Sequence, residues 1–228
     1  MKKFFLLLVF ACLLCWFYFS ASNNIEGSGI KTEEFVDTVS FSLKRGDILV
    51  RPNFDWLPGS YSINTGRMFG HVAIVTEDVS EKSIDDMLAK ASVIEAVVFD
   101  QKTRSFIFDK NEQVRVTKAI ISFGSRFKGI RYRLRMNLTD QQTEDLLLFL
   151  KNQLDGGYSL FTVKKFVDPD SEKKIALRNL NWHCASIAWQ AYYQATGVDI
   201  DENNGLVVFP ADIIGSKYFD LHGGRIRF

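Results

Sequence analysis

Cysteine and histidine are scarce in this chain, and their positions limit the chemistry that it can carry. Cys12 and Cys15 lie in an apolar N-terminal run, so Cys184 is the single thiol of the remaining body. Because it has no internal disulfide partner, Cys184 is a buried filler, an intermolecular bridge or a reactive thiol. A thiolate nucleophile also needs a base. Three histidines could serve as this base, namely His71, His183 and His222.

Cys184 stands at the start of a predicted helix that Gly197 ends. The first turn of a helix carries the positive end of its dipole, which favours a thiolate over a thiol. A backbone N–H at this position can also hold an oxyanion. The alternative is that Cys184 is a small buried apolar residue, a common fate of free cysteine. The lack of a second body cysteine favours the reactive interpretation.

His71 and Glu95 are the residues best suited to assist such a thiol. His71 opens the run GHVAIVTE, and Glu95 is the one carboxylate in the apolar run VIEAVV. A lone acid in an apolar strand is costly to bury without a partner. If the two strands are neighbours, Glu95 accepts a hydrogen bond from His71 and orients it as the third member of a triad does. The alternatives leave His71 half-exposed at a strand start and place Glu95 at an exposed position or against an arginine.

His183 is the weaker base candidate. It is adjacent to Cys184 in the sequence, and neighbouring residues on a helix do not face each other. We therefore expect its side chain to point away from the thiol and assign it to the substrate contacts. The other two predicted contacts, Trp56 and Tyr61, lie in an aromatic loop punctuated by proline and glycine.

A scaffold of strands followed by helices is predicted to position these residues. Runs rich in β-branched residues predict strands at 48–50, 70–77, 92–99, 112–118 and 129–136. Residues 81–91 form a short helix or a hairpin excursion. A capping box of Thr139 and Gln142 opens a helix that a glycine pair ends at 156–157. Strands in the first half and helices in the second favour an α+β fold over an alternating parallel sheet.

The last predicted strand has an unusual pattern of charge. Its arginines alternate with apolar residues, which predicts a half-buried strand with a solvated basic face. An alternative role for that face is contact with a phosphate. The residues concerned are Arg131, Arg133 and Arg135.

The N-terminal segment differs in composition from the rest of the chain. Lys2 and Lys3 precede an apolar run that is followed by small polar residues, the layout of an export signal. Residues 1–22 are predicted to be a signal peptide or a membrane anchor, with lipidation at Cys12 as a third alternative and tethering through residues 4–21. Residues 23–40 are predicted to be a tether, and residues 41–228 a single domain. An exported, envelope-associated protein is therefore expected.

Composition excludes several classes of partner. The 28 basic residues, which include the two lysines of the leader, nearly balance 27 acidic ones, so bulk attraction to nucleic acid is not expected. Three scattered histidines without paired cysteines do not make a metal site. The chain also lacks a glycine loop of the kind that cradles phosphates. No cofactor is therefore predicted.

The order of these motifs adds a resemblance. GDILVR, GHVAIV and VIEAVV precede a cysteine helix in WHCASIAWQAYYQATGVDI, followed by FPADI. Over residues 44–218 this resembles the YiiX-like permuted members of the NlpC superfamily, papain-fold cysteine hydrolases in which the histidine strand precedes the cysteine helix. The resemblance implies Cys184 as the nucleophile, His71 as the base and Glu95 as the orienting residue. It also implies a small antiparallel barrel packed against the cysteine helix.

One departure from the family concerns the neighbours of the cysteine. The family often has an aromatic residue just before it and a Ser-Glu pair just after it. Here His183 precedes Cys184, and Ala185 and Ser186 follow it. The three site residues are unaffected, but substrate contacts near the helix start are expected to differ.

Three functions are compatible with this pattern. The first is an exported cysteine amidohydrolase or peptidase that forms an acyl-enzyme on cell-wall-derived or other small peptides. The second is an acyltransferase or acyl hydrolase acting on lipids, as in relatives of lecithin:retinol acyltransferase with the same permuted layout. The third is a non-catalytic binding module of the envelope. The oligomeric state is not indicated by the sequence.

Overall fold

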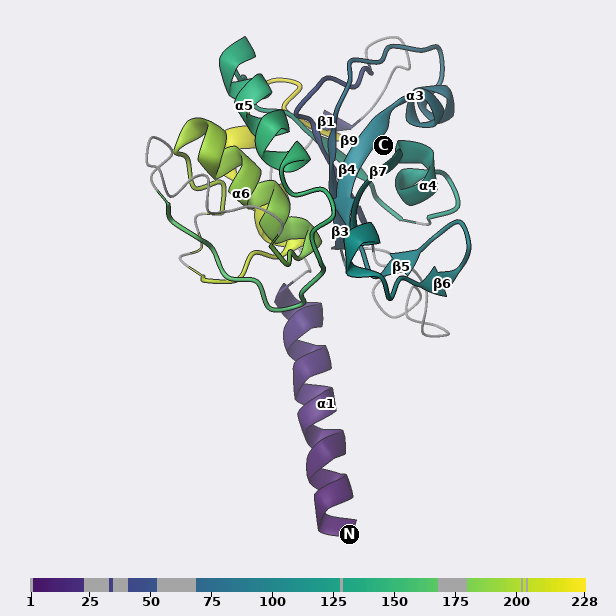
Figure 1. Cartoon of the computed structure of the whole chain (residues 1–228), viewed down its shortest axis with the longest axis vertical. Helices are drawn as coiled ribbons and strands as arrows, with labels where there is room; N and C mark the ends of the chain where they lie inside the picture. The colour runs from purple at the N-terminus through teal and green to yellow at the C-terminus, as the bar shows by residue number, and fades with distance from the viewer. Residues whose placement is uncertain are drawn as a thin grey trace.

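A mostly antiparallel sheet of seven strands organises the chain (Figure 1). The computed structural model describes residues 2–22, 33–34, 41–52, 69–127, 129–167, 180–201, 203 and 205–228. The strands lie in the order β1-β9-β8-β2-β3-β4-β7. They are β1 (Glu33–Glu34), β2 (Ile48–Pro52), β3 (Phe69–Val75), β4 (Ser92–Ala96), β7 (Val114–Lys118), β8 (Tyr132–Leu134) and β9 (Arg225–Arg227). A separate two-stranded sheet contains β5 (Phe99–Asp100) and β6 (Ser105–Phe106).

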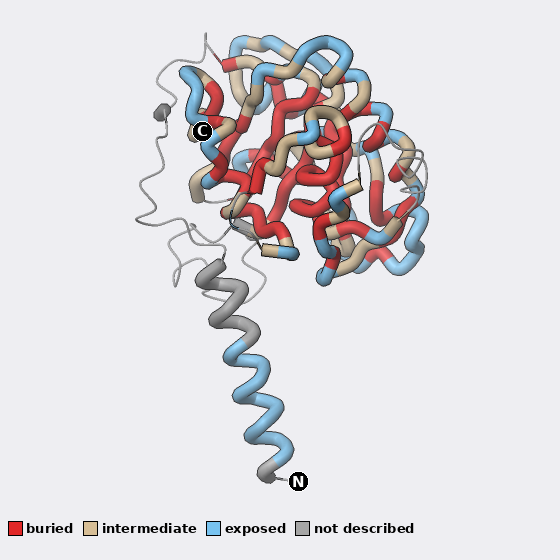
Figure 2. The backbone as a smooth tube through the Cα atoms, turned by 90° about the vertical axis from the view of Figure 1, so that its left-hand side faces the viewer, coloured by how far each residue is buried: buried red, intermediate tan, exposed pale blue. Residues whose placement is uncertain are grey.

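Helices cover both faces of the large sheet (Figure 1). On one face, alternate strand residues pack against α5 (Asp140–Lys151), α6 (Cys184–Thr196) and α7 (Pro210–Gly215). On the other face, the intervening residues pack against α3 (Ile84–Lys90) and α4 (Ala119–Phe123). Short 3-10 turns occupy Lys110–Glu112 and Lys217–Phe219. The central strands β2, β4 and β8 and residues 71–75 of β3 are therefore almost wholly buried, and the buried residues lie in the interior of the domain in Figure 2.

Local sequence signals account for the starts of α3 and α5 and for the end of α6, but α5 ends at Lys151, before the glycine pair at 156–157 that was predicted to end it. Thr139 and Gln142 form the predicted capping box of α5, with the Gln142 N–H donating to Thr139 Oγ1 at 3.2 Å. Gly197 ends α6 with a φ of 71°, a left-handed conformation that favours glycine. Residues 81–91 contain the helix α3 and not a hairpin, because the Ser83 hydroxyl accepts from the Asp86 N–H and caps it.

The sheet is open, whereas the resemblance implied a small barrel. Closing a sheet requires its two edge strands to pair with each other. In the described part of the chain, β1 pairs with β9 alone and β7 pairs with β4 alone. The mixed α/β architecture with an antiparallel sheet is confirmed, and the small closed barrel is not present among these strands.

The predicted solvated arginine face on β8 is wrong. Arg133 is 2% exposed, and its Nη2 donates to the carbonyl of Gly223 at 2.7 Å. Arg135 makes a two-pronged ion pair with the buried Asp47, at 2.7 Å for each of Nε and Nη2. All three residues of β8 are buried, and β2 and β9 pair with its two edges, so this strand has no solvated face. Each of these side chains makes at least one internal polar contact, and Arg131 donates from Nη1 to the carbonyl of Phe123 at 2.7 Å.

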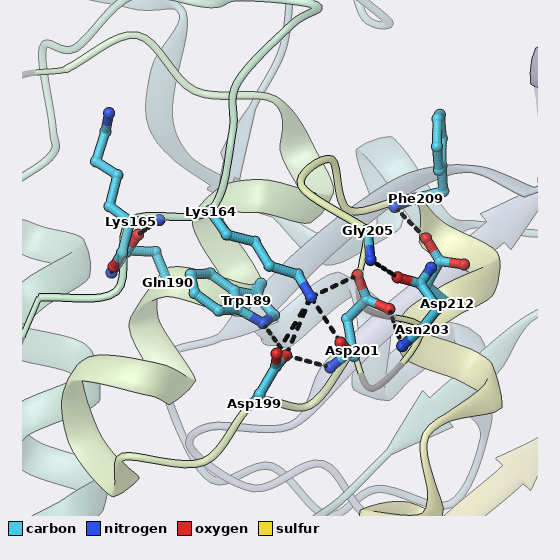
Figure 3. Close-up of polar contacts among 10 residues, drawn as sticks. All are labelled: Lys164, Lys165, Trp189, Gln190, Asp199, Asp201, Asn203, Gly205, Phe209 and Asp212. Atoms are coloured by element: carbon cyan, nitrogen blue, oxygen red, sulfur yellow. Dashed lines mark hydrogen bonds and ion pairs between the residues drawn. The ribbon is translucent and has the colours of Figure 1, made fainter.

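A buried lysine joins the segments on either side of α6 (Figure 3). Lys164 is 6% exposed, and its Nζ lies 3.2 Å from Asp199 Oδ1 and 3.1 Å from Asp201 Oδ2. Asp199 Oδ1 also accepts a hydrogen bond from Trp189 Nε1 at 2.7 Å. Because Trp189 belongs to α6, this cluster fixes the segment before the helix to the loop after it.

The structure describes residues 2–22 and 33–34 of the N-terminal segment. The helix α1 (Lys2–Ser22) exposes the apolar side chains described along it (Figure 2). Among the described residues, no helix combines the length and the apolar character needed to cross a membrane. In the predicted tether, β1 pairs in parallel with β9, and the other residues of 23–40 lie outside the described part. The signal or anchor assignment stays a prediction.

Candidate functional site

Cys184 is the first residue of α6 and lies where that helix meets β3. The side chain is 1% exposed, and Sγ lies 3.9 Å from the carbonyl oxygen of Gly70. Gly70 has no side chain to block this approach, and it directly precedes His71 on β3. The helix can begin here because His183 caps it: Nδ1 of His183 accepts from the Ala185 N–H at 3.3 Å.

His71 and Glu95 come from neighbouring antiparallel strands, β3 and β4. They are 4% and 0% exposed, and His71 Nε2 lies 2.8 Å from Glu95 Oε2. The ring of Phe123 stacks on His71 with 5.5 Å between centroids, which limits the rotation of the imidazole. Because Glu95 occupies Nε2, Nδ1 is the nitrogen of His71 that remains for the thiol.

The charges of the three groups support one another. Burial alone raises the pKa of the Cys184 thiol, but His183 and His71 together hold that pKa well below its ordinary value of 9.0. Burial lowers the pKa of His71, and interactions with Cys184 and Glu95 outweigh it, so the pKa is raised. The pKa of Glu95 is lowered by His71 against the effect of burial. A thiolate and an imidazolium therefore coexist over a range of pH between the two shifted values.

The expectation that His183 points away from the thiol is wrong. Its Nε2 lies 3.8 Å from Cys184 Sγ. As the N-cap residue it has an extended backbone, with φ of −82° and ψ of 152°, so helical spacing does not govern its direction. The charge of Cys184 raises the pKa of His183 against burial. The thiol thus sits between two imidazoles.

Hydrogen bonding distinguishes the roles of these imidazoles. Nδ1 of His183 accepts the Ala185 N–H and therefore carries a lone pair, which leaves Nε2 as the N–H donor toward the thiol. Taking up a proton at Nδ1 would break the cap of α6. His71 instead has a buried carboxylate to stabilise its imidazolium. This geometry favours His71 over His183 as the group that would accept a proton from the thiol, and it directs the Nε2–H of His183 toward Sγ.

Two arginines extend the site beyond the residues that sequence reasoning selected. Arg115 lies opposite Glu95 on β7, with Nε 3.5 Å from Glu95 Oε1, and its Nη1 pairs with Asp100 at 2.8 Å. Arg51 lies opposite His71 on β2 and is 6% exposed. The signal for Arg51 was a lone charge in the apolar run ILVRP, the same signal that identified Glu95.

Other predicted residues do not join the site. His222 is exposed in a C-terminal turn. Trp56 and Tyr61 lie outside the described residues, so their predicted substrate contacts stay predictions. Within the described ranges, no group of three or more histidine, cysteine or acidic side chains is arranged to share a metal ion.

Comparison with known proteins gives limited likenesses. No family model matches the sequence. A stretch of 62 residues is 37% identical to the uncharacterized protein YycO of Bacillus subtilis strain 168, and it spans only 25% of either chain. The crystal structure of the metalloprotein yiiX from Escherichia coli O157:H7 aligns over 71% of both chains with a TM-score of 0.41 and 19% identity. The chain is therefore similar to these two proteins over part of its length.

Proposed function

We propose that this protein is a cysteine hydrolase of the amidase or peptidase type. One observation carries the proposal: a thiol with a lowered pKa at the first residue of a helix adjoins an imidazole that a fully buried carboxylate holds at 2.8 Å. A buried cysteine that served only as packing would have a raised pKa, because burial disfavours the thiolate. The combination of Cys184, His71 and Glu95 matches the nucleophile, base and orienting group of acyl transfer.

The reaction follows from these positions. The Cys184 thiolate attacks the carbonyl carbon of an amide, and the electron pair of the C=O bond moves to oxygen. The backbone N–H of Cys184, which as a first-turn donor has no intrahelical acceptor, stabilises that oxyanion. The His71 imidazolium then protonates the leaving nitrogen as the C–N bond breaks. Water, deprotonated by His71, hydrolyses the thioester, releases the acid and regenerates the thiolate and imidazolium.

The pH dependence of alkylation tests the proposal. Cys184 of the purified protein should react with iodoacetamide well below the pH at which an ordinary thiol ionises, since its pKa is lowered. His71→Ala should shift this reactivity to higher pH. His222→Ala is the matched control, because His222 is an exposed histidine away from the site, and it should behave as the wild type. A Cys184 that is inert, or indifferent to the loss of His71, would favour the non-catalytic binding module instead.

The substrate proposal rests on the sequence pattern. The leader-like N-terminal segment suggests an exported enzyme and hence a small peptide of the cell envelope as substrate. Incubation of the protein with defined peptides, followed by detection of new amino groups, tests this. Cys184→Ala is the negative control.

A specific observation keeps lipid acyl groups as a second candidate substrate. Leu160 and Phe161 are 59% and 73% exposed, and they follow Ser159, whose N–H donates to the carbonyl of Trp182 at 3.0 Å. Exposed apolar side chains thus lie in the segment that runs beside the start of the Cys184 helix, where they could contact an acyl chain. Release of fatty acid from a phospholipid or acyl ester would favour this candidate, and release of amine from a peptide would favour the amidase.

A further inference from the structure

We propose that Arg51 is an anion-binding residue of the site and that the preferred substrate is a peptide whose released residue carries a free α-carboxylate. This inference rests on the proposed function and names its substrate class. It predicts an enzyme that removes a carboxyl-terminal residue and cleaves the same bond poorly when that terminus is an amide.

The position of Arg51 is the first support. Arg51 pairs with His71 across β2 and β3, and a bulge separates it from Pro52, which pairs with Phe69. Residues directly opposite each other in antiparallel strands have Cβ atoms about 4.5–5.5 Å apart and share one face. The intervening residue on β3 is Gly70, whose carbonyl faces the thiol. Arg51 therefore stands beside both the base and the nucleophile.

The charge of Arg51 is unmatched in the described part of the chain. Nη1 donates to the carbonyl of Pro52 at 2.8 Å, and Nε is buried without an acceptor. No carboxylate of the described residues forms an ion pair with it. Burial lowers the pKa of Arg51 to about 10, although the charges of Glu95 and Cys184 act in the opposite direction. A buried cation without a paired anion is unfavourable, and an anionic ligand would relieve that cost.

A second cation lies next to the first. The guanidinium groups of Arg51 and Arg126 both lie over the ring of Phe127, at 4.1 Å and 4.8 Å from its centroid. Arg126 donates to the backbone carbonyls of Gln101 and Ile121 and, among the described residues, forms no ion pair. By contrast, Arg115 on the far side of Glu95 is already paired with an aspartate. Arg51 and Arg126, neither of which forms an ion pair among the described residues, thus lie together on one side of His71.

The chemistry of the reaction decides where the anion belongs. His71 protonates the leaving nitrogen, and Arg51 is the cross-strand neighbour of His71. In a peptide that loses its last residue, the α-carboxylate is two bonds from that nitrogen. A guanidinium presents two parallel N–H donors that match a planar carboxylate. The leaving residue of the substrate therefore places its carboxylate toward Arg51.

Two alkylating reagents of similar size test the charge requirement. Iodoacetate carries a carboxylate and iodoacetamide carries a neutral amide. The rate of iodoacetate divided by the rate of iodoacetamide at Cys184 therefore measures how strongly the site attracts an anion. Arg51→Gln should lower that ratio at least about tenfold, the low end for a hydrogen bond to a charged group. Arg51→Lys should give an intermediate ratio because lysine keeps the positive charge but lacks the two parallel N–H donors of the guanidinium. Arg45→Gln, a surface arginine paired with Glu144, is the matched control and should leave the ratio unchanged.

The outcomes separate this inference from the proposed function. If the wild type reacts fast with iodoacetamide but Arg51→Gln does not change the rate ratio, the anion site is refuted and the proposed function is not. Slow reaction of the wild type with both reagents would overturn the proposed function and the anion site together. If Arg51→Gln does not fold, the wild type still decides the matter: acetate should protect Cys184 from iodoacetamide competitively and acetamide should not. Equal protection by both, or by neither, would contradict the proposal.

Discussion

Replacement of Glu95 by glutamine should weaken the reactivity of Cys184 solely through His71. The variant keeps the shape and a hydrogen-bond acceptor at 2.8 Å from His71 Nε2 but removes the negative charge. A hydrogen bond to a charged group contributes about 1.5–3 kcal/mol and a neutral one about 0.5–1.5 kcal/mol. The difference of about 1–1.5 kcal/mol corresponds to roughly a five- to thirteenfold loss in the alkylation rate of the ion pair.

The sign of the accompanying pH shift follows from the charges. Glu95 raises the pKa of His71, so its neutralisation lowers that pKa. A less protonated His71 stabilises the thiolate less, and the pKa of Cys184 rises. The pH at which Cys184 becomes a thiolate should therefore move to a higher value. The pH at which the His71 imidazolium loses its proton should move to a lower value. The window in which the ion pair exists narrows from both sides.

A double-mutant cycle is the decisive assay for this prediction. The rate of iodoacetamide reaction is measured against pH for the wild type, Glu95→Gln, His71→Ala and the double variant. Glu95→Gln should have no further effect once His71 is alanine. An equal loss in both backgrounds would refute the reasoning, because Glu95 would then act on the thiol directly or through the fold. Glu112→Gln, an exposed residue, controls for a general effect of lost charge.

Three further predictions follow from the contacts. His183→Ala should cost about 1 kcal/mol of stability through loss of the α6 cap and should reduce Cys184 alkylation by less than His71→Ala does, as urea unfolding and alkylation rates check. Lys164→Met should cost about 3–5 kcal/mol in urea unfolding because it leaves the carboxylate of Asp201 unpaired, and Asp201→Asn should restore part of the loss. Burial raises the pKa of Asp212 from 3.8 to about 6, so the folded state holds this proton more tightly; the wild type should lose stability relative to Asp212→Asn as pH rises between these values.

Local signals in the sequence predicted the start of α5 and the end of α6, whereas α5 ends at Lys151 and not at the predicted glycine pair 156–157. The capping pair at Thr139 and the glycine at 197 act within a few residues of the helix ends that they set, so no tertiary information was needed. The pairing of His71 with Glu95 was also predictable, because a lone acid in an apolar strand requires a partner and few candidates existed.

The burial of Arg133, the direction of His183 and the place of Arg51 were not predicted, because none of them follows from the local sequence pattern. Arg133 follows the alternation of a half-exposed strand, but the folded chain buries it, and its partner at Gly223 is 90 residues away. The direction of His183 depends on the extended backbone of an N-cap residue and not on helical spacing. Arg51 carried the same signal as Glu95, and only the neighbouring strand β3 shows that it belongs to the site.

The close approach of Cys184 to Gly70 joins points 114 residues apart in the sequence. Contacts of such high separation form late in folding, because the loop between them must close first. Before α6 docks on β3, Cys184 lacks His71 and Glu95, although its neighbour His183 already belongs to the same segment. Full activation of the thiol therefore waits for this contact, and the appearance of fast alkylation at Cys184 during refolding would time the docking of α6 on β3.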